Sequence, residues 1–370
     1  MRQSALPAPE LTGCPAPGPP RPPPRRERPN GPRSVPVTPD FEVYATARTA
    51  RPGEPHGLSA LTEISRTAEA NGVTGLLAFY HHHNPDPWLV ASTLLGATDR
   101  LVPLIATQPY ALPPFTAAQM IHTLTVLHGR RVDLNLITGA TGAELRQVGE
   151  TLDATERYAR AAEYAHVVRR LLSEEGPITF AGTHYRFEGL RMNTPLALAL
   201  RPRVFLAGSS PAALATAREA ADVAVTHPEP VDRFAADYAR ALAGGPRIGI
   251  RVGIVARPTA AEAWTVAREA YRETRASRLA TALRRTSGSD WSRRLAALAI
   301  DGDVYDDVYW TGAYRADKGT LPLLVGAYAD VAGYLARYRA AGVRVLVLGN
   351  TSTAEDFGHV AAVLAELRRD

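Results

Sequence analysis

Residues 131–139 read Arg-Val-Asp-Leu-Asn-Leu-Ile-Thr-Gly, a strand-like run that ends in a polar turn. Two later segments belong with it. Glu156-Arg157-Tyr158 opens a helical stretch, and the short apolar run 204–207 leads into Gly208-Ser209-Ser210 and a second helix. Free backbone amides at a helix start favour an anion. Together the three segments are predicted to hold a flavin, with its ring at one end and its phosphate at the other.

Outward from this stretch, short apolar runs alternate with helical stretches, as a parallel α/β barrel requires. Eight strands are predicted, which indicates a closed (β/α)8 barrel with all strand C-termini on one face. The predicted strands are 41–47, 75–79, 101–107, 132–137, 204–207, 221–226, 247–256 and 343–348. Helices are predicted at 58–70, 116–127, 155–172, 211–219 and 327–341.

Two segments do not follow this repeat. Residues 178–190 alternate around an Ala-Gly turn and are predicted to form a hairpin. Residues 276–318 form a long arginine-rich segment between the seventh and eighth strands. Long insertions on this face of a barrel generally cover a site.

The first 40 residues differ from the rest in composition, since they hold thirteen of the thirty prolines and the only cysteine, Cys14. We predict a disordered tail over 1–40 and one barrel domain over 41–370. The tail also carries much of the formal net charge of +5, so no nucleic-acid partner is expected. Without a signal peptide, a membrane span or a second cysteine, the sequence indicates a cytoplasmic enzyme.

The order of several motifs resembles the bacterial-luciferase-like flavin-dependent monooxygenases, and most closely their alkanesulfonate monooxygenase branch. Besides the three segments above, the resemblance includes residues 86–91, Gly249-Ile250-Arg251, and Arg315 with Lys318-Gly319-Thr320. It extends from about residue 41 to the C-terminus. It implies a luciferase-like TIM barrel with insertions at its C-terminal face, which binds reduced FMN (FMNH2), activates O2 as a C4a-peroxyflavin and oxygenates a small organic substrate.

The resemblance also implies roles for individual residues. Those expected to take the flavin phosphate are Arg157, Tyr158, Ser209 and Ser210, and those expected to face the ring are Thr107, Asn135 and Thr138. The chain has no Gly-x-Gly-x-x-Gly fingerprint for a nicotinamide. The expected partner is therefore a separate NAD(P)H-dependent flavin reductase in a two-component system. Relatives of this kind are commonly homo-oligomers.

Arg251 stands within a predicted barrel strand, where a charge must be paired or must bind an anion. One interpretation is a buried ion pair with a barrel carboxylate. The resemblance implies the other, a contact with anionic substrate or peroxide, in which Arg315 takes part. Positions that are polar in the sulfonate branch are changed here, and they are Arg48, Asn84, Gly253 and Thr351. The changes predict a different substrate, in specialised metabolism, in place of simple alkanesulfonate cleavage.

Three histidines, His81 to His83, follow the second predicted strand. Consecutive side chains point in different directions, so at most two could bind one ion, and no metal is expected. We predict that His83, with the neighbouring Asn84, reaches the active site, although solvated loop histidines are the other interpretation. His227, after the sixth predicted strand, is a second candidate for the pocket.

Other functions remain open at this point. Relatives that use the deazaflavin F420 for hydride transfer share the barrel, and the Ala/Arg/Gly/Pro-rich composition suits the high-GC organisms in which F420 is common. A metal-dependent barrel hydrolase would use His81, His83 and His227, and tightly bound zinc would identify it. A flavin-binding relative without catalytic activity is a further alternative.

Overall fold

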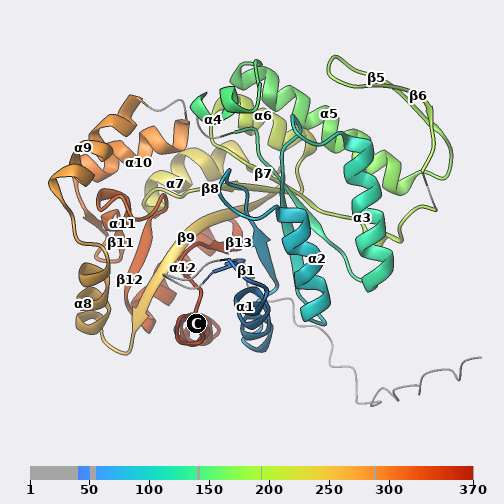
Figure 1. Cartoon of the computed structure of the whole chain (residues 1–370). Coiled ribbons are helices and arrows are strands. Elements are labelled where there is room, and N and C mark those ends of the chain that lie inside the picture. Colours follow the sequence, from blue (N-terminus) through green and yellow to red (C-terminus); the bar gives the residue numbers. More distant parts are fainter. Residues whose placement is uncertain (1–40, 51–55, 140–141, 193, 287–288, 370) are drawn as a thin grey trace, which may run out of the picture. The chain divides into compact units, whose positions relative to one another are not determined.

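The computed structural model describes residues 41–50, 56–139, 142–192, 194–286 and 289–369. Eight parallel strands close into a ring (Figure 1). In order around the ring they are β1 (Glu42–Thr46), β2 (Gly75–Ala78), β3 (Val102–Thr107), β4 (Asp133–Leu136), β7 (Val204–Ala207), β8 (Val223–Thr226), β9 (Arg247–Arg257) and β13 (Val343–Leu348). These are the eight strands expected from the sequence, and the closed barrel is confirmed. The predicted tail, 1–40, lies outside the described residues.

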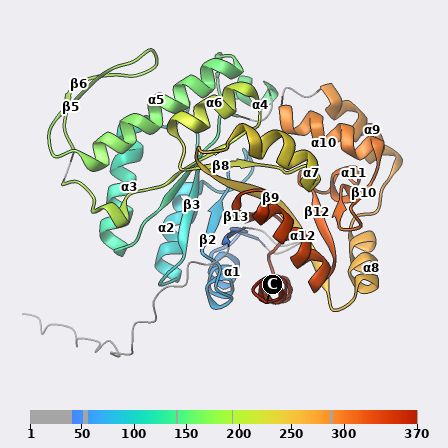
Figure 2. The same cartoon turned by 180° about the vertical axis from the view of Figure 1, so that it is seen from behind.

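Helices cover the outside of the ring, as the views from opposite sides show (Figures 1 and 2). They are α1 (Leu58–Ala70), α2 (Pro87–Ala97), α3 (Pro114–His128), α4 (Gly142–Gln147), α5 (Ala154–Ser173), α6 (Pro211–Ala220), α7 (Val231–Phe234), α12 (Tyr328–Ala340) and α13 (Ala354–Leu367). A capping box begins α5, in which the Asp153 side chain accepts from the Glu156 amide and the Glu156 side chain accepts from the Asp153 amide. This start fixes Arg157 and Tyr158 on the first turn of α5.

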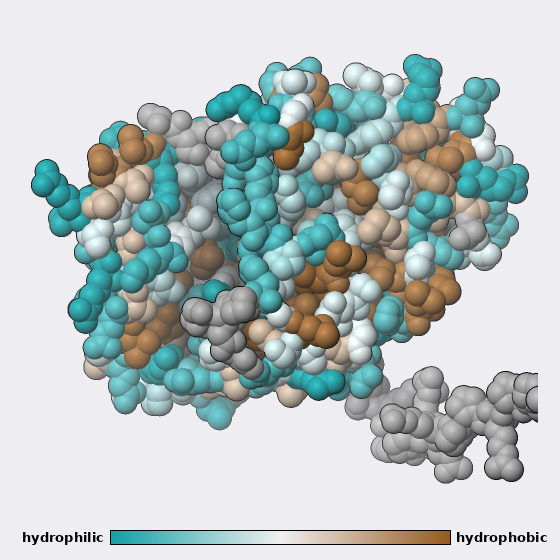
Figure 3. All heavy atoms as spheres, viewed as in Figure 1, coloured by the Kyte–Doolittle hydropathy of each residue, from teal (hydrophilic) through white to brown (hydrophobic). Residues whose placement is uncertain are grey.

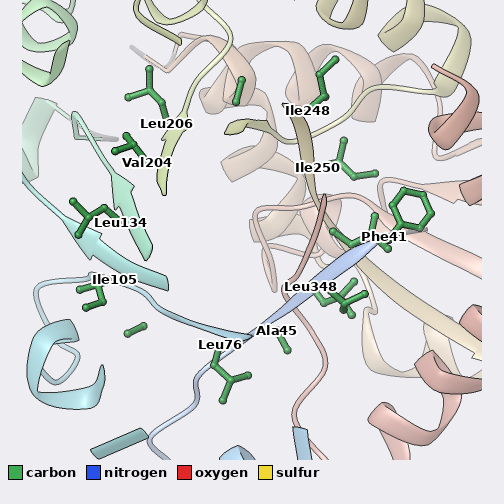
Figure 4. Packing of buried hydrophobic residues seen from close by; sticks show 14 of the residues in the cluster. Phe41, Ala45, Leu76, Ile105, Leu134, Val204, Leu206, Ile248, Ile250 and Leu348 are labelled. Atoms are coloured by element: carbon green, nitrogen blue, oxygen red, sulfur yellow. The ribbon is translucent and has the colours of Figure 1, made fainter. Parts of the chain in front are cut away.

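Alternate residues of each strand belong to two different layers. One set packs outward against the helices, and Figure 4 shows its members on neighbouring strands, including Ala45, Leu76, Ile105 and Leu134. The other set fills the ring and comes from strands alone, with Tyr44, Leu77, Leu104, Phe205, Val223, Val225, Val345 and Val347. Because side chains alternate along a strand, the parity of a residue decides whether it can reach the centre of the barrel.

Charged residues close the amino-terminal end of the ring. Asp133 is fully buried at the start of β4, where it accepts from the Tyr44 hydroxyl at 2.9 Å and from Arg203 at 3.0 Å. Arg203 also pairs with Glu42 at 2.7 Å. This network joins the starts of β1 and β4 to the residue before β7, and its charges serve stability, because barrel active sites lie at the other end.

The insertions are built as separate small units. The predicted hairpin is confirmed, as β5 (Ile178–Ala181) pairs antiparallel with β6 (Arg186–Leu190). The arginine-rich segment contains α9 (Arg275–Leu283), α10 (Asp290–Asp301), β10 (Val304–Tyr305), β11 (Tyr309–Trp310) and α11 (Gly312–Arg315). Two short 3-10 turns, η1 (Leu198–Leu200) and η3 (Arg284–Thr286), and a turn of π-helix, η2 (Ala235–Ala239), complete the list with α8 (Ala260–Ala270).

Three strands were not expected from the sequence, namely the short β10 and β11 and the longer β12. β12 (Leu323–Ala327) pairs parallel with residues 253–257 of β9, whereas residues 247–252 of β9 pair with β8 and β13 in the barrel. The eleven-residue β9 therefore belongs to the ring over its first half only. The second half carries the β10–β11–β12 extension. Among the described residues, no helix combines the length and the apolar character needed to cross a membrane.

Candidate active site

The predicted site residues converge on the carboxyl-terminal end of the barrel. His81 to Asn84 follow β2, Thr107 ends β3, Thr138 follows β4, Ser209 follows β7 and His227 follows β8. Parallel strands place these ends on one face. The site is therefore built from the loops that follow at least five strands. The charged network of Glu42, Asp133 and Arg203 lies at the opposite end of the barrel.

Hydrogen bonds join the end of β4, the start of α5 and the end of β7. The Tyr158 hydroxyl on α5 donates to the Ala207 carbonyl at the end of β7, at 3.1 Å. Arg157 Nε donates to the Thr138 carbonyl after β4 at 2.7 Å. The first turn of α5 thus bridges the ends of β4 and β7. Arg157 also donates to the Leu152 carbonyl at 2.6 Å, so two nitrogens of its guanidinium bind backbone carbonyls.

Gly208 allows this close approach. Its φ is +148°, and a Cβ there would collide with the Tyr158 hydroxyl and lie 2.7 Å from the Ala213 Cβ. No other residue type fits without displacing Tyr158. The loop after β7 is thereby held against α5 where α6 begins, and a helix N-terminus favours an anion such as a phosphate.

The two serines of this loop already have partners. Ser210 is the N-cap of α6 and accepts from the Ala213 amide at 3.3 Å. Ser209 donates from its hydroxyl to Asp290 at 2.8 Å. Asp290 belongs to α10, so a carboxylate of the insertion sits where the resemblance implies a phosphate. A phosphate at Ser209 requires Asp290 to move away or to be screened.

Arg251 points into the ring. It has the same parity as Gly249, whose Cβ would meet Val223, Val225 and Val345 of the inner layer. Burial lowers the pKa of the Arg251 guanidinium to about 10. Within the described part of the chain no side chain forms a hydrogen bond or an ion pair with it. The ion pair with a barrel carboxylate, one of the two interpretations of Arg251, is absent from these residues.

His227 lies beside that arginine. Its ring stacks on Trp291 of α10 at 4.0 Å between centroids and 21° between planes. Burial, with the positive charges of Arg251 and Arg294, holds the pKa of His227 well below its usual value, so the imidazole is neutral at pH 7. Its Nε2 is buried and has no hydrogen-bond partner in the described structure. A neutral ring nitrogen and a cation therefore lie near each other, and neither has a side-chain hydrogen-bond partner among the residues that the structure describes.

The end of β3 differs from expectation in detail. Thr107 is fully buried, shares the outward parity of Ile105, and donates to the Ile105 carbonyl at 3.2 Å. The next residue, Gln108, has the inward parity, and its buried Nε2 lacks a partner among the described residues. Asn135 shares the inward parity of Asp133. The structure thus brings Gln108, which the sequence reasoning did not select, to the inner face.

The histidine loop after β2 interacts mainly with α4. His82 Nδ1 is 2.9 Å from Gln147 Oε1, and His81 Nε2 is 3.6 Å from Glu144. The rings of His81 and His83 lie 5.3 Å apart. The Asn84 amide donates to the His81 carbonyl at 3.0 Å and closes the turn. Within the described ranges, no three His, Cys, Asp or Glu side chains are grouped as metal ligands would be.

Gly253 and Arg315, two of the positions singled out in the sequence, lie in β9 and in the insertion that follows it. Arg315 on α11 pairs with Glu273 at 2.6 Å, and its role toward substrate stays a prediction. At Gly253 a Cβ would collide with Leu323 and lie 2.7 Å from Asn350 Oδ1. Asn350 is fixed there because its amide bonds both the N–H and the carbonyl of Ile254 at 3.0 Å. The space that a side chain at position 253 would need is filled here by neighbouring side chains.

The first turn of α10 supplies residues that the sequence analysis missed. Asp290 contacts Ser209, Trp291 stacks on His227, and Arg294 pairs with both Asp290 and Glu229. All three lie far from the barrel strands in sequence, within the arginine-rich insertion. The only signal for them was the expectation that this insertion covers a site. That insertion reaches the loops after β7 and β8.

Comparisons with known proteins agree with this geometry. A family model described as "Luciferase-like monooxygenase" matches residues 40–345. A relative from Niallia circulans, the 4-(gamma-L-glutamylamino)butanoyl-[BtrI acyl-carrier protein] monooxygenase BtrO, is 39% identical over 313 residues. The match covers 84% of this chain and 92% of that protein.

Solved structures share the fold. The EDTA monooxygenase EmoA from Chelativorans superposes with a TM-score of 0.70 at 17% identity, over 88% of this chain and 93% of its own. An F420-dependent secondary alcohol dehydrogenase superposes with a TM-score of 0.63 at 16% identity, over 89% and 99%. At such identities the likeness shows the fold alone, and proteins that use different cofactors share it.

Proposed function

This chain belongs to the luciferase-like monooxygenases, and from that premise we propose that it is the oxygenase of a two-component system that uses reduced FMN. One observation supports the cofactor and the chemistry together. At the end where the loops meet, the barrel encloses a cation, Arg251, and a neutral imidazole, His227, and among the described residues neither the guanidinium nor the imidazole Nε2 has a side-chain hydrogen-bond partner. Such groups are retained when a ligand satisfies them.

The fit of a flavin rests on the chain's own geometry. Gly208 lets the Tyr158 hydroxyl approach the loop after β7, and the N-terminus of α6 begins beside this contact, where a phosphate is favoured. We assign the phosphate to this helix start and the ring to the inner face near Asn135, Thr138 and Gln108. Thr107 is retained as a second-choice ring contact because its hydroxyl already donates to backbone. Bound reduced flavin supplies the electrons for O2 activation.

The residues around that cofactor have separable roles. Arg251 provides a fixed positive charge in a region of low polarity, where it stabilises negative charge that develops on oxygen. His227 is held neutral, so its Nε2 can accept a proton or donate a hydrogen bond according to its tautomer. Trp291 covers His227 and excludes water from this side. His83, Asn84 and Arg315 are proposed as substrate contacts at the rim.

For the substrate we propose an acyl group held as a thioester on an acyl-carrier protein. The support is the 39% identity with a monooxygenase whose name specifies such a substrate. The changed positions Asn84 and Gly253 agree with a substrate other than an alkanesulfonate. A role in specialised metabolism, as predicted, fits the same relative. F420-dependent hydride transfer stays as the alternative, which the composition of the chain suits but no contact in the site favours.

A homo-oligomer is proposed from the surface of α2 and α3. Neither helix contains Asp, Glu, Lys or Arg, and the two pack against each other. They expose Leu89 by 70%, Val126 by 60% and Leu127 by 73%. Figure 3 shows apolar surface in the part of the molecule where Figure 1 draws these helices. A second copy of the chain would bury it.

The decisive experiment is anaerobic titration of the full chain with reduced FMN, oxidised FMN and reduced F420, followed by mixing with oxygen. We expect reduced FMN to bind at least tenfold more tightly than the other two, and oxygen to be consumed with acyl-carrier-protein substrate present. Preferential binding of reduced F420 would replace the proposal by hydride transfer. Failure to bind any of the three would remove the cofactor assignment altogether.

A further inference from the structure

The helix α9 buries polar side chains and exposes apolar ones, the reverse of an ordinary surface helix. Its buried side chains are the polar Ser277 and Thr281, and Thr281 donates to the Tyr314 carbonyl at 3.3 Å. Its leucines face the solvent, with Leu279 exposed by 64% and Leu283 by 65%. A surface helix normally buries its apolar residues. Apolar side chains at i and i+4 that point outward indicate a surface on which another molecule packs.

Arginines surround those leucines. Arg275 and Arg278 lie on the same exposed face at helical spacing, and Arg285 follows in the next turn. Their guanidinium groups have no ion-pair partner within the described residues. From 272 to 285 the chain has five arginines and a single carboxylate, Glu273, which pairs with Arg315. This stretch is strongly basic, so its exposed face complements an acidic partner.

The face belongs to the insertion that reaches the site. α9 packs on α10 and α11, and the first turn of α10 contacts the loops after β7 and β8 through Asp290 and Trp291. Figure 3 shows apolar surface bordered by hydrophilic side chains where Figure 1 draws α9 and α10. A partner held on α9 would therefore stand next to the helix that covers His227.

We propose that the exposed face of α9, formed by Arg275, Arg278, Leu279 and Leu283 with Arg285, is the docking surface for the carrier protein that presents the acyl substrate. The inference rests on the proposed carrier-bound substrate. Acidic side chains of the carrier pair with the arginines, and apolar side chains between them pack on the leucines. The bound carrier then directs its thioester arm past α10 into the barrel. A nucleic acid would use the arginines but would leave the leucines exposed.

The test measures binding of the BtrI carrier protein, bearing its phosphopantetheine arm, to the full chain. The double variant Arg275→Glu/Arg278→Glu is compared with Arg240→Glu/Arg368→Glu, which reverses two exposed arginines at helix ends that face the opposite end of the barrel. We expect the first pair to weaken the Kd at least tenfold and the control pair to change it less than twofold. Leu279→Ser/Leu283→Ser is expected to weaken binding to a similar degree without the same salt dependence.

Reduced-FMN affinity is measured on every variant and separates the two proposals. Unchanged flavin binding with weakened carrier binding supports the docking surface. Equal carrier binding by the wild type and both α9 variants, or no carrier binding by the wild type, overturns it while leaving the flavin result to stand alone. If the α9 variants instead lose only delivery of FMN from a flavin reductase, the partner of this face is the reductase and the proposal is wrong.

Discussion

Replacing Arg251 by Met should stabilise the protein while it removes activity. A pKa lowered from 12.5 to about 10 corresponds to about 3 kcal/mol, at roughly 1.4 kcal/mol for each pH unit. Arginine is charged in both the folded and the unfolded chain below pH 10, so this cost applies in full at pH 7. Methionine matches the stem in length and carries no charge. Because the guanidinium borders the open end of the barrel, we expect a gain of about 1–2 kcal/mol.

The assay is urea unfolding followed by tryptophan fluorescence and by circular dichroism, together with oxygenation kinetics. The rate with saturating reduced FMN should fall about 100-fold, the effect typical of one electrostatic group at a reacting oxygen. The matched control is Arg203→Lys, at the other end of the barrel, which loses the forked bonds to Asp133 and Glu42. It should lose about 1–2 kcal/mol and keep its rate. A destabilised Arg251→Met that retains its rate would show that Arg251 is structural.

The remaining predictions concern the loops around the site. Gly208→Ala should weaken reduced-FMN binding at least tenfold, measured by fluorescence titration, whereas Gly189→Ala, also at positive φ but in open space, should leave it unchanged. The pKa of His227 is depressed in the folded protein, so at low pH the unfolded chain binds a proton that the folded chain does not. The free energy of unfolding should therefore fall as the pH drops below about 6.5, by up to about 1.4 kcal/mol per pH unit. His227→Gln should flatten that part of the unfolding profile; an unchanged slope would mean that other groups cause it. Asp290→Asn removes a carboxylate from the proposed phosphate loop and should tighten FMN binding about threefold to tenfold at low salt, an effect that Asp301→Asn at the far end of α10 should not reproduce.

Much of the fold was predictable because the barrel repeats one pattern. Apolar runs of four to ten residues, with the motifs at their ends, predicted all eight barrel strands. β12 was missed although residues 321–327 are apolar, because an eight-stranded repeat was already complete and a strand shared between two sheets leaves no periodic signal.

The site was predictable only in part. Sequence order indicated that Tyr158, Gly208 and Arg251 belong together, since the first lies at a helix start, the second at a strand end and the third within a barrel strand. It could not indicate that Ser209 meets Asp290 or that Trp291 covers His227, because those contacts span 64 to 81 residues and depend on how an insertion folds back. The sequence also could not show which of two successive side chains at a strand end faces the inside of the barrel. For this reason Thr107 was predicted to contact the ring in place of Gln108.

The ionic network of Glu42, Asp133 and Arg203 has a consequence for how this enzyme can diversify. The groups that hold the strands in register are at one end of the barrel, and the residues that meet ligands are at the other. Loops at the ligand end can therefore be exchanged between relatives with little penalty to folding. Exchanging the α9–α11 segment between relatives should therefore change substrate specificity. The first residues of each strand should be kept, because they hold the barrel framework.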